Sequence, residues 1–341
     1  MAERRRLEIV NSFQLTRLIE STGTTGSPTT RIDAACSGWA PGSLTITCVL
    51  TGFLAASSSF CMGQASAPAA AQENAGLLVR ETVYNELHDH QKHGYWRYWV
   101  EANGPSGTRI EEQVETVDGP VGRVLLRNGH RLDAEGEQLE QAKLEELRNS
   151  PAKQASKREA YQQDEGRVTR ILALLPDAFV FHDAGTEKGV RHLKYTPNSK
   201  YSAHGIEAKV FHELSGDLWI DTRAKRLRRL EGHLNDNVDF GFGVLGRVNK
   251  GGWFRLVRKA VSPDEWKTER LEMHMSGRAL LFKSIAHETS EVRGGFEAVP
   301  PAMSMAQGLQ VLEASVAARE AAWDEGRISP ATWRVERPGG R

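Results

Sequence analysis

Cysteine is absent from most of this chain. The three cysteines, Cys36, Cys48 and Cys61, all precede Met62, and none follows it. The long region after Met62 therefore has no disulfide framework, no thiolate zinc site and no thiol nucleophile. A cysteine-free domain also suits passage through an oxidising compartment, because it has no thiols that could mispair there.

An excess of charge of either sign is absent as well. The 44 Lys and Arg residues equal the 44 Asp and Glu residues in number. A chain without net charge has no overall field that attracts nucleic acid or an acidic membrane surface. We therefore expect no nucleic-acid partner, and at most a peripheral association with membranes.

Motifs for catalysis and cofactor binding are also missing. The sequence contains no GxSxG, HExxH or P-loop pattern. Gly241–Gly246 spells GxGxxG, but a turn and a strand follow it where a dinucleotide site needs a helix. His88, His90 and His93 crowd one helix end, yet their spacing does not place them on one face. We therefore predict no enzyme activity, no cofactor and no metal.

The N-terminal region has the layout of an exported protein. No charged residue occurs between Asp33 and Glu73, and Leu44–Ala56 forms an apolar core within that span. The small-x-small sequence Ala65-Ser66-Ala67 follows, as in a secretory signal peptide. The core is too short and too rich in Ser, Thr and Gly for a membrane span.

We predict that residues 1–67 form a disordered leader ending in a signal peptide, with cleavage after Ala67. Export to the periplasm or cell envelope follows from this prediction. Two alternatives stay open. The nearest cation before the apolar core is Arg31, so the segment could be a cytoplasmic tail. Cys61 could carry a lipid, although Phe60 is large for the residue that precedes a lipidated cysteine.

The remaining chain is predicted to form one domain over residues 68–325, with a frayed tail at 326–341. Residues 73–92 have the apolar spacing of an amphipathic helix. Residues 95–101, 108–117 and 121–127 are rich in aromatic and β-branched residues and predict three strands. Residues 133–175 predict a charged helical insert of two helices, broken at Ser150-Pro151 and ended by Pro176.

The second half returns to a period of two residues, which is typical of strands. Short turns separate these strands, and short turns force neighbouring strands to be antiparallel. Residues 303–323 predict a last helix. The predicted strands are 178–183, 190–196, 209–221, 226–234, 240–248, 253–261, 266–275 and 280–292.

One face of this predicted sheet is apolar. Leu271, Met273 and Met275 alternate with charged or polar neighbours. A half-buried sheet needs a cover, and the helices at 73–92 and 133–175 are available for it. We predict an α+β fold in which a curved antiparallel sheet forms an incomplete β-barrel covered by helices.

Large apolar side chains are the remaining candidates for a binding site. Core packing explains such residues in most proteins, but an open sheet with one apolar face could also accept an acyl chain. The residues predicted to line a cavity are Trp96, Phe211, Trp219, Phe240, Phe242, Trp253, Leu271, Met273 and Met275.

Two short motifs resemble known exported proteins. The sequence from Gly216 to Asp221 (Gly-Asp-Leu-Trp-Ile-Asp), followed by Leu227–Gly232, resembles a hairpin of the outer-membrane lipoprotein-sorting and lipoprotein-carrier-like superfamily. Leu175–Phe179 resembles a segment of uncharacterised exported bacterial proteins. The first resemblance implies an unclosed barrel with helices as a lid and acyl chains in the interior. It identifies no individual site residue, and the insert at 133–175 departs from the compact pattern of the carriers.

We therefore expect a non-enzymatic envelope protein that binds an apolar or lipidated ligand inside an open β-barrel. The expected partners are a lipid or a lipidated protein. One alternative is an envelope scaffold that acts through its charged helical insert. Another is a hydrolase with carboxylates paired across strands, a pairing that a sequence does not reveal.

Overall fold

The computed structural model describes residues 67–88, 94–104, 107–240, 246–279 and 283–325. Phe242, the predicted leader before Ala67 and the predicted tail at 326–341 lie outside these residues.

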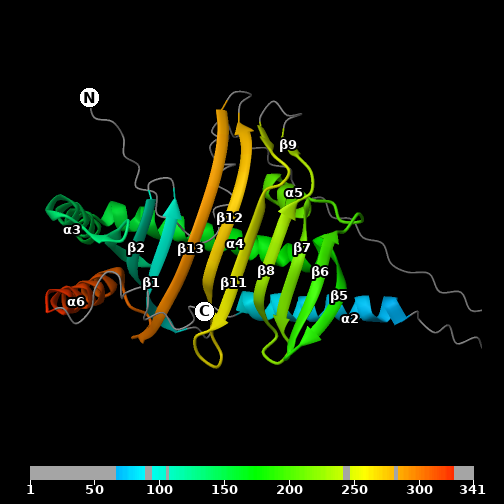
Figure 1. Ribbon diagram of the computed structural model, residues 1–341, viewed down its shortest axis with the longest axis horizontal. Coiled ribbons are helices and arrows are strands. Elements are labelled where there is room, and N and C mark those ends of the chain that lie inside the picture. Colours follow the sequence, from blue (N-terminus) through cyan, green and yellow to red (C-terminus); the bar gives the residue numbers. More distant parts are fainter. Residues whose placement is uncertain (1–66, 89–93, 105–106, 241–245, 280–282, 326–341) are drawn as a thin grey trace, which may run out of the picture.

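Thirteen strands form one sheet (Figure 1). Every strand pairing in it is antiparallel. The strands are β1 (Tyr95–Gly104), β2 (Gly107–Val114), β3 (Val121–Arg127), β4 (His130–Arg131), β5 (Phe179–Glu187), β6 (Val190–Pro197), β7 (Leu214–Asp221), β8 (Arg226–Leu234), β9 (Val238–Phe240), β10 (Gly246–Val248), β11 (Trp253–Ala260), β12 (Trp266–Ala279) and β13 (Lys283–Val299).

The sheet order is β4-β3-β2-β1-β13-β12-β11-β8-β7-β6-β5, and β10 and β9 extend it beside β12. Strands β4 and β5 are its two edges, so the sheet is not closed into a barrel. The helices are α2 (Ala67–His88), α3 (Ala134–Asn149), α4 (Pro151–Ala178), α5 (Ile206–His212) and α6 (Met305–Asp324). The prediction of a mixed fold with a large antiparallel sheet is confirmed.

The break within the helical insert is also confirmed. The Ser150 hydroxyl accepts a hydrogen bond from the Lys153 amide at 3.3 Å, and Pro151 is the first residue of α4. Proline suits this position because its missing N–H would have no partner within the helix. The predicted end of this helix was wrong: Pro176 lies inside α4, which ends at Ala178. The fixed backbone angle of proline fits a helix, and near the end only one helical bond is lost.

Several strand boundaries differ from the prediction; β13, for example, continues to Val299 beyond the predicted end at 292. Residues 209–212 belong to α5, where Val210 and Phe211 are buried. A short apolar run can form either a helical turn or a strand, so its sequence does not decide between them. In the predicted strand 240–248, β9 ends at Phe240 and β10 begins at Gly246, and these two strands pair with each other. The strand predicted to end at residue 275 instead continues as β12 to Ala279, in pairing with β13.

A row of five leucines crosses the middle of the sheet. Leu193, Leu218, Leu230, Leu256 and Leu271 lie directly opposite one another on β6, β7, β8, β11 and β12. Residues opposite each other in a sheet share a face, and all five leucines are buried. We call the face that carries this leucine row the α2 face.

Helices contact both faces of the sheet. Helix α2 packs against β5, β8 and α4, and its apolar side chains join the leucine row in one core cluster. Helix α6 packs against β2 and β3 in a second cluster. That cluster contains Ile110 and Val114, whose side chains point away from the α2 face. Helices α2 and α4 both run behind the strands in Figure 1.

Candidate functional site

Helix α2 presents an apolar stripe to the sheet. Ala75, Leu78, Val79 and Val83 recur every three or four residues, which places them on one side of a helix. All four are buried in the core cluster. The side chain of Tyr84 points the other way and is 61% exposed. This spacing fixes which side of α2 faces the strands.

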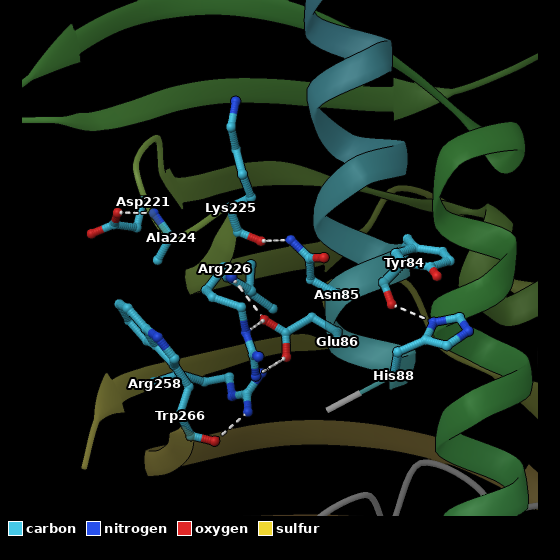
Figure 2. Close-up of polar contacts among 11 residues, drawn as sticks. Tyr84, Asn85, Glu86, His88, Asp221, Ala224, Lys225, Arg226, Arg258 and Trp266 are labelled. Atoms are coloured by element: carbon cyan, nitrogen blue, oxygen red, sulfur yellow. Dashed lines mark hydrogen bonds and ion pairs between the residues drawn. The ribbon is translucent and has the colours of Figure 1, made fainter. Parts of the chain in front are cut away.

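Glu86 occupies the next position of that stripe, and it is a buried carboxylate. Only 6% of the residue is exposed. Its Oε1 accepts hydrogen bonds from Arg226 Nε at 3.1 Å and from the Leu227 amide at 2.9 Å. Its Oε2 accepts from Arg226 Nη2 at 3.2 Å and from Arg258 Nη1 (Figure 2). Two guanidinium groups and one backbone amide therefore converge on a single carboxylate.

Arg258 joins this cluster to the next strand of the sheet. It lies on β11, and its Nη2 donates to the Trp266 carbonyl of β12 at 2.5 Å. Burial lowers the pKa of Arg258 to about 10, so the guanidinium keeps its charge at neutral pH. We call Glu86, Arg226 and Arg258 the ion cluster. It joins the C-terminal turn of α2 to the first residue of β8 and to β11.

Two polar contacts nearby also hold α2 in place. Asn85 Nδ2 donates to the Lys225 carbonyl at 3.1 Å, immediately before β8 (Figure 2). On the other side of the helix, Arg80 Nη2 donates to Asp177 Oδ1 of α4 at 2.7 Å. Arg80 and Asp177 are both more than half exposed, so this ion pair stabilises the helix little. The buried ion cluster is thus the main polar attachment among these contacts.

A buried ion cluster has a particular energetic character. Desolvation offsets much of the attraction between the charges, so it stabilises a structure less than apolar packing of equal volume. Removal of one partner is nonetheless strongly unfavourable, because it leaves buried charge without compensation. Such a cluster therefore adds less to the free energy of folding than its number of contacts suggests.

The residues predicted to line a cavity do not all come together. Four of them lie in the core cluster of the α2 face, and Phe240 packs against that cluster. Trp96 belongs to a separate small cluster with Tyr98 and Val100. The four core residues are Phe211, Leu271, Met273 and Met275.

Trp219 and Trp253 point to the opposite face of the sheet. Trp219 stacks on His192, with ring centroids 4.5 Å apart and planes 4° apart. The guanidinium carbon of Arg229 lies 4.5 Å from the centroid of the Trp219 ring. Trp253 is 42% exposed and lies opposite His233 and His274 in the strand register. These two tryptophans are therefore separated by the sheet from the apolar residues predicted to accompany them.

The ion cluster itself was not predicted. A partial signal was present, because Glu86 follows Val79 and Val83 at helical spacing and thus falls on the buried side of α2. Its partners could not be identified in the same way. Arg226 and Arg258 lie 140 and 172 residues further along the chain. Only the strand register and the docking of α2 bring them together.

No metal or membrane-spanning element is identified in the part of the chain that the structure describes. Within the described residues, no group of three or more His, Cys, Asp or Glu side chains could hold a metal ion. None of the described helices combines the length and the apolar character needed to cross a membrane. Comparison of the chain with protein-family models, curated proteins and solved structures finds no match.

Proposed function

We propose that this is a non-enzymatic protein of the cell envelope that binds an apolar or lipidated ligand on the α2 face. In this proposal the open sheet acts as an incomplete barrel, and α2 and α4 act as its cover. Helix α2 moves aside to admit the ligand, whose apolar chain then replaces the inner stripe of the helix. The leucine row across five strands is the observation that carries the proposal.

The free energies involved support such an exchange. Burial of an aliphatic side chain stabilises by about 2 kcal/mol, and burial of one methylene group by about 0.8 kcal/mol. The three larger apolar side chains of the α2 stripe, Leu78, Val79 and Val83, are therefore worth roughly 6 kcal/mol together. An acyl chain of about eight methylene groups buries an equivalent apolar surface. A ligand of ordinary length could compensate for the departure of α2.

The ion cluster suits a contact that opens and closes. A directional contact between buried charges defines one closed position for α2, and water can solvate the same charges once the helix has left. A helix held by apolar packing alone would have no comparable alternative partner in solvent. We therefore assign to the ion cluster the role of holding α2 in its closed position over the sheet.

The test uses two matched variants of α2. Glu86→Gln removes the buried charge, whereas Glu81→Gln removes a charge that is 55% exposed and pairs with Lys225 at 3.4 Å. Binding of a fluorescent hydrophobic probe is measured for both and for the wild type, with lipid extraction of the purified wild type in parallel. We expect Glu86→Gln to bind more probe and Glu81→Gln to match the wild type. If wild type and Glu86→Gln both take up no probe and carry no lipid, the proposal is wrong.

A second candidate function places a partner on the helical insert. Leu139 of α3 is 62% exposed, which is unusual for a leucine on a helix that otherwise packs against α4 and α6. This would make the protein an interaction module of the envelope. Leu139→Glu should then abolish cross-linking to a partner in envelope extracts without changing the circular dichroism spectrum. Unchanged cross-linking would exclude Leu139 from such an interface.

A further inference from the structure

The α2 face changes from apolar to polar part of the way across the sheet. The leucine row ends at Leu271, and the next residues opposite one another are Glu291 on β13, Ala102 on β1 and Arg109 on β2. The neighbouring row changes in the same place, because Met273 lies opposite Thr289. One surface therefore has an apolar half over β6–β12 and a second half over β13, β1 and β2 that carries charged side chains. We call the second half the polar half, although the buried Tyr98 and Val100 of β1 also lie in it, opposite Gln113 and Glu111.

The side chains on one side of helix α4 also change from apolar to polar along its length. Residues 157, 161, 164, 168, 171, 175 and 178 recur every three or four positions and so share one side of the helix. Its C-terminal part contributes Ile171, Leu175 and Ala178 to the apolar core cluster. Its N-terminal part contributes Lys157 and Tyr161. The helix and the sheet thus change from apolar to polar in the same direction along α4.

The position of the N-terminal part of α4 is fixed by the turn between β2 and β3. Arg158 Nε donates to Asp118 Oδ1 at 2.5 Å. The ring of Tyr161 packs so closely on this turn that a Cβ atom added to Gly119 would lie 2.7 Å from it. Lys157 and Tyr161 therefore lie beside the polar half of the α2 face. Besides burial, Glu111 and Lys143 act on the pKa of Lys157, and Glu165 and Glu115 raise the pKa of Tyr161.

The carboxylates of this polar half already have partners. Glu111 accepts from Gln113 Nε2 at 3.2 Å, and Glu115 accepts from Lys267 Nζ at 3.0 Å. Glu291, only 1% exposed, accepts from Arg293 Nη2 at 2.8 Å. Their capacity to bind a further cation is accordingly reduced.

Two hydrogen-bond donors remain available. Among the residues that the structure describes, neither the Lys157 ammonium nor the Tyr161 hydroxyl has a hydrogen-bond or ion-pair partner. Burial lowers the pKa of Lys157 and raises the pKa of Tyr161, which is the effect of removing water from both groups. Two partly desolvated donors, one turn apart, match an acceptor that carries negative charge.

We infer that the ligand is an anionic amphiphile whose head group binds Lys157 and Tyr161 while its chain lies along the leucine row. This inference rests on the proposed function and names the class of ligand. From Tyr161 to Ile171 the helix rises about 15 Å, since each residue adds about 1.5 Å. An acyl chain of medium length spans that distance and reaches the apolar half of the face.

The test compares two ligands that differ only in the head group. Dodecanoate and dodecanol have the same chain, but only dodecanoate carries a carboxylate. Each ligand is titrated, below its micelle-forming or solubility limit, against a bound fluorescent probe. The proteins tested are the wild type and the variants Lys157→Met, Tyr161→Phe and Lys153→Met. Each is also tested with Glu86→Gln added, so that a closed α2 does not hide binding. Lys153 lies one turn earlier on α4 and is 58% exposed, so Lys153→Met is the matched control.

We expect the wild type and Lys153→Met to bind dodecanoate about tenfold more tightly than dodecanol, the usual size of one charge-assisted hydrogen bond. Lys157→Met should lose this preference while its affinity for dodecanol is unchanged, and Tyr161→Phe should lose part of it. Equal affinity of the wild type for both ligands would overturn the head-group inference and leave the proposed function intact. A preference that survives in Lys157→Met would overturn it as well. If neither ligand binds in either background, the proposed function itself fails.

Discussion

Glu86 and Arg226 form a two-point contact between α2 and the first residue of β8. Glu86 Oε1 lies 3.1 Å from Arg226 Nε, and Oε2 lies 3.2 Å from Arg226 Nη2. Both residues are more than nine-tenths buried. A paired contact of this geometry constrains distance and orientation together. It therefore fixes α2 over the apolar half of the sheet in a single arrangement.

Truncation of Glu86 should destabilise the protein strongly. Glu86→Ala leaves Arg226 and Arg258 buried without their shared carboxylate, a change that costs about 3–5 kcal/mol. Chemical denaturation of Glu86→Ala and of Glu81→Ala measures the difference. Glu81→Ala, which disrupts an exposed pair, should change the free energy of unfolding by less than about 1 kcal/mol. Equal effects of the two variants would show that the cluster does not behave as a buried one.

Replacement of the whole ion cluster by apolar residues should give the opposite result. In the triple variant Glu86→Met, Arg226→Met, Arg258→Met, no charge is desolvated, so stability should equal or exceed that of the wild type. Apolar packing should also hold α2 more permanently. We therefore expect thermal unfolding at an equal or higher temperature together with reduced uptake of a hydrophobic probe. A triple variant that binds more probe than the wild type would contradict this assignment.

The centre of the leucine row should be sensitive to truncation. Leu230 lies between Leu218 and Leu256 and is 4% exposed. Leu230→Ala should lower the free energy of unfolding by about 2–5 kcal/mol, because it removes buried methyl groups and leaves a cavity. Leu139→Ala, at an exposed position of α3, should change it by less than about 0.5 kcal/mol. Denaturant titration of both variants measures the contrast.

The pKa of Lys157 predicts a specific dependence of stability on pH. Burial holds this pKa below its ordinary value of 10.5. At pH values between the pKa of Lys157 in the folded chain and 10.5, the folded chain binds fewer protons than the unfolded chain. The free energy of unfolding therefore rises with pH in this range. Burial of the charged Lys157 lowers stability by its full amount at pH values below the pKa of Lys157 in the folded chain. This destabilisation disappears above pH 10.5. Lys157→Met should flatten this rise, and Lys153→Met should not.

Alternation of apolar and polar residues was sufficient to predict most of the sheet. Residues 226–234 and 253–261 were placed as strands, and β8 and β11 occupy nearly the same ranges. The period of two also fixed which side chains share a face, since Leu256 and Phe254 are buried together. Strand order could not be predicted in this way. The pairing of β1 with β13 joins residues about 200 apart, and nothing in either segment alone specifies it.

The same alternation also separates the aromatic candidates onto two faces of the sheet. Trp253 is in phase with Arg255, and Trp219 is in phase with Asp217, so both tryptophans belong to the polar face. Their size made them candidates for a cavity, although their position in the pattern predicts the opposite face. In contrast, Met273 and Met275 are in phase with Leu271 and lie in the core cluster.

Amide hydrogen exchange of α2, with and without a bound lipid, tests most directly whether this helix leaves the sheet. The amides of residues 67–88 are compared with those of β7 and β8, first in the delipidated protein and then with saturating dodecanoate. We predict that the ligand speeds exchange throughout α2 while β7 and β8 keep or increase their protection. Bound ligand together with unchanged or slower exchange in α2 would show that the helix stays in place and that the ligand binds elsewhere.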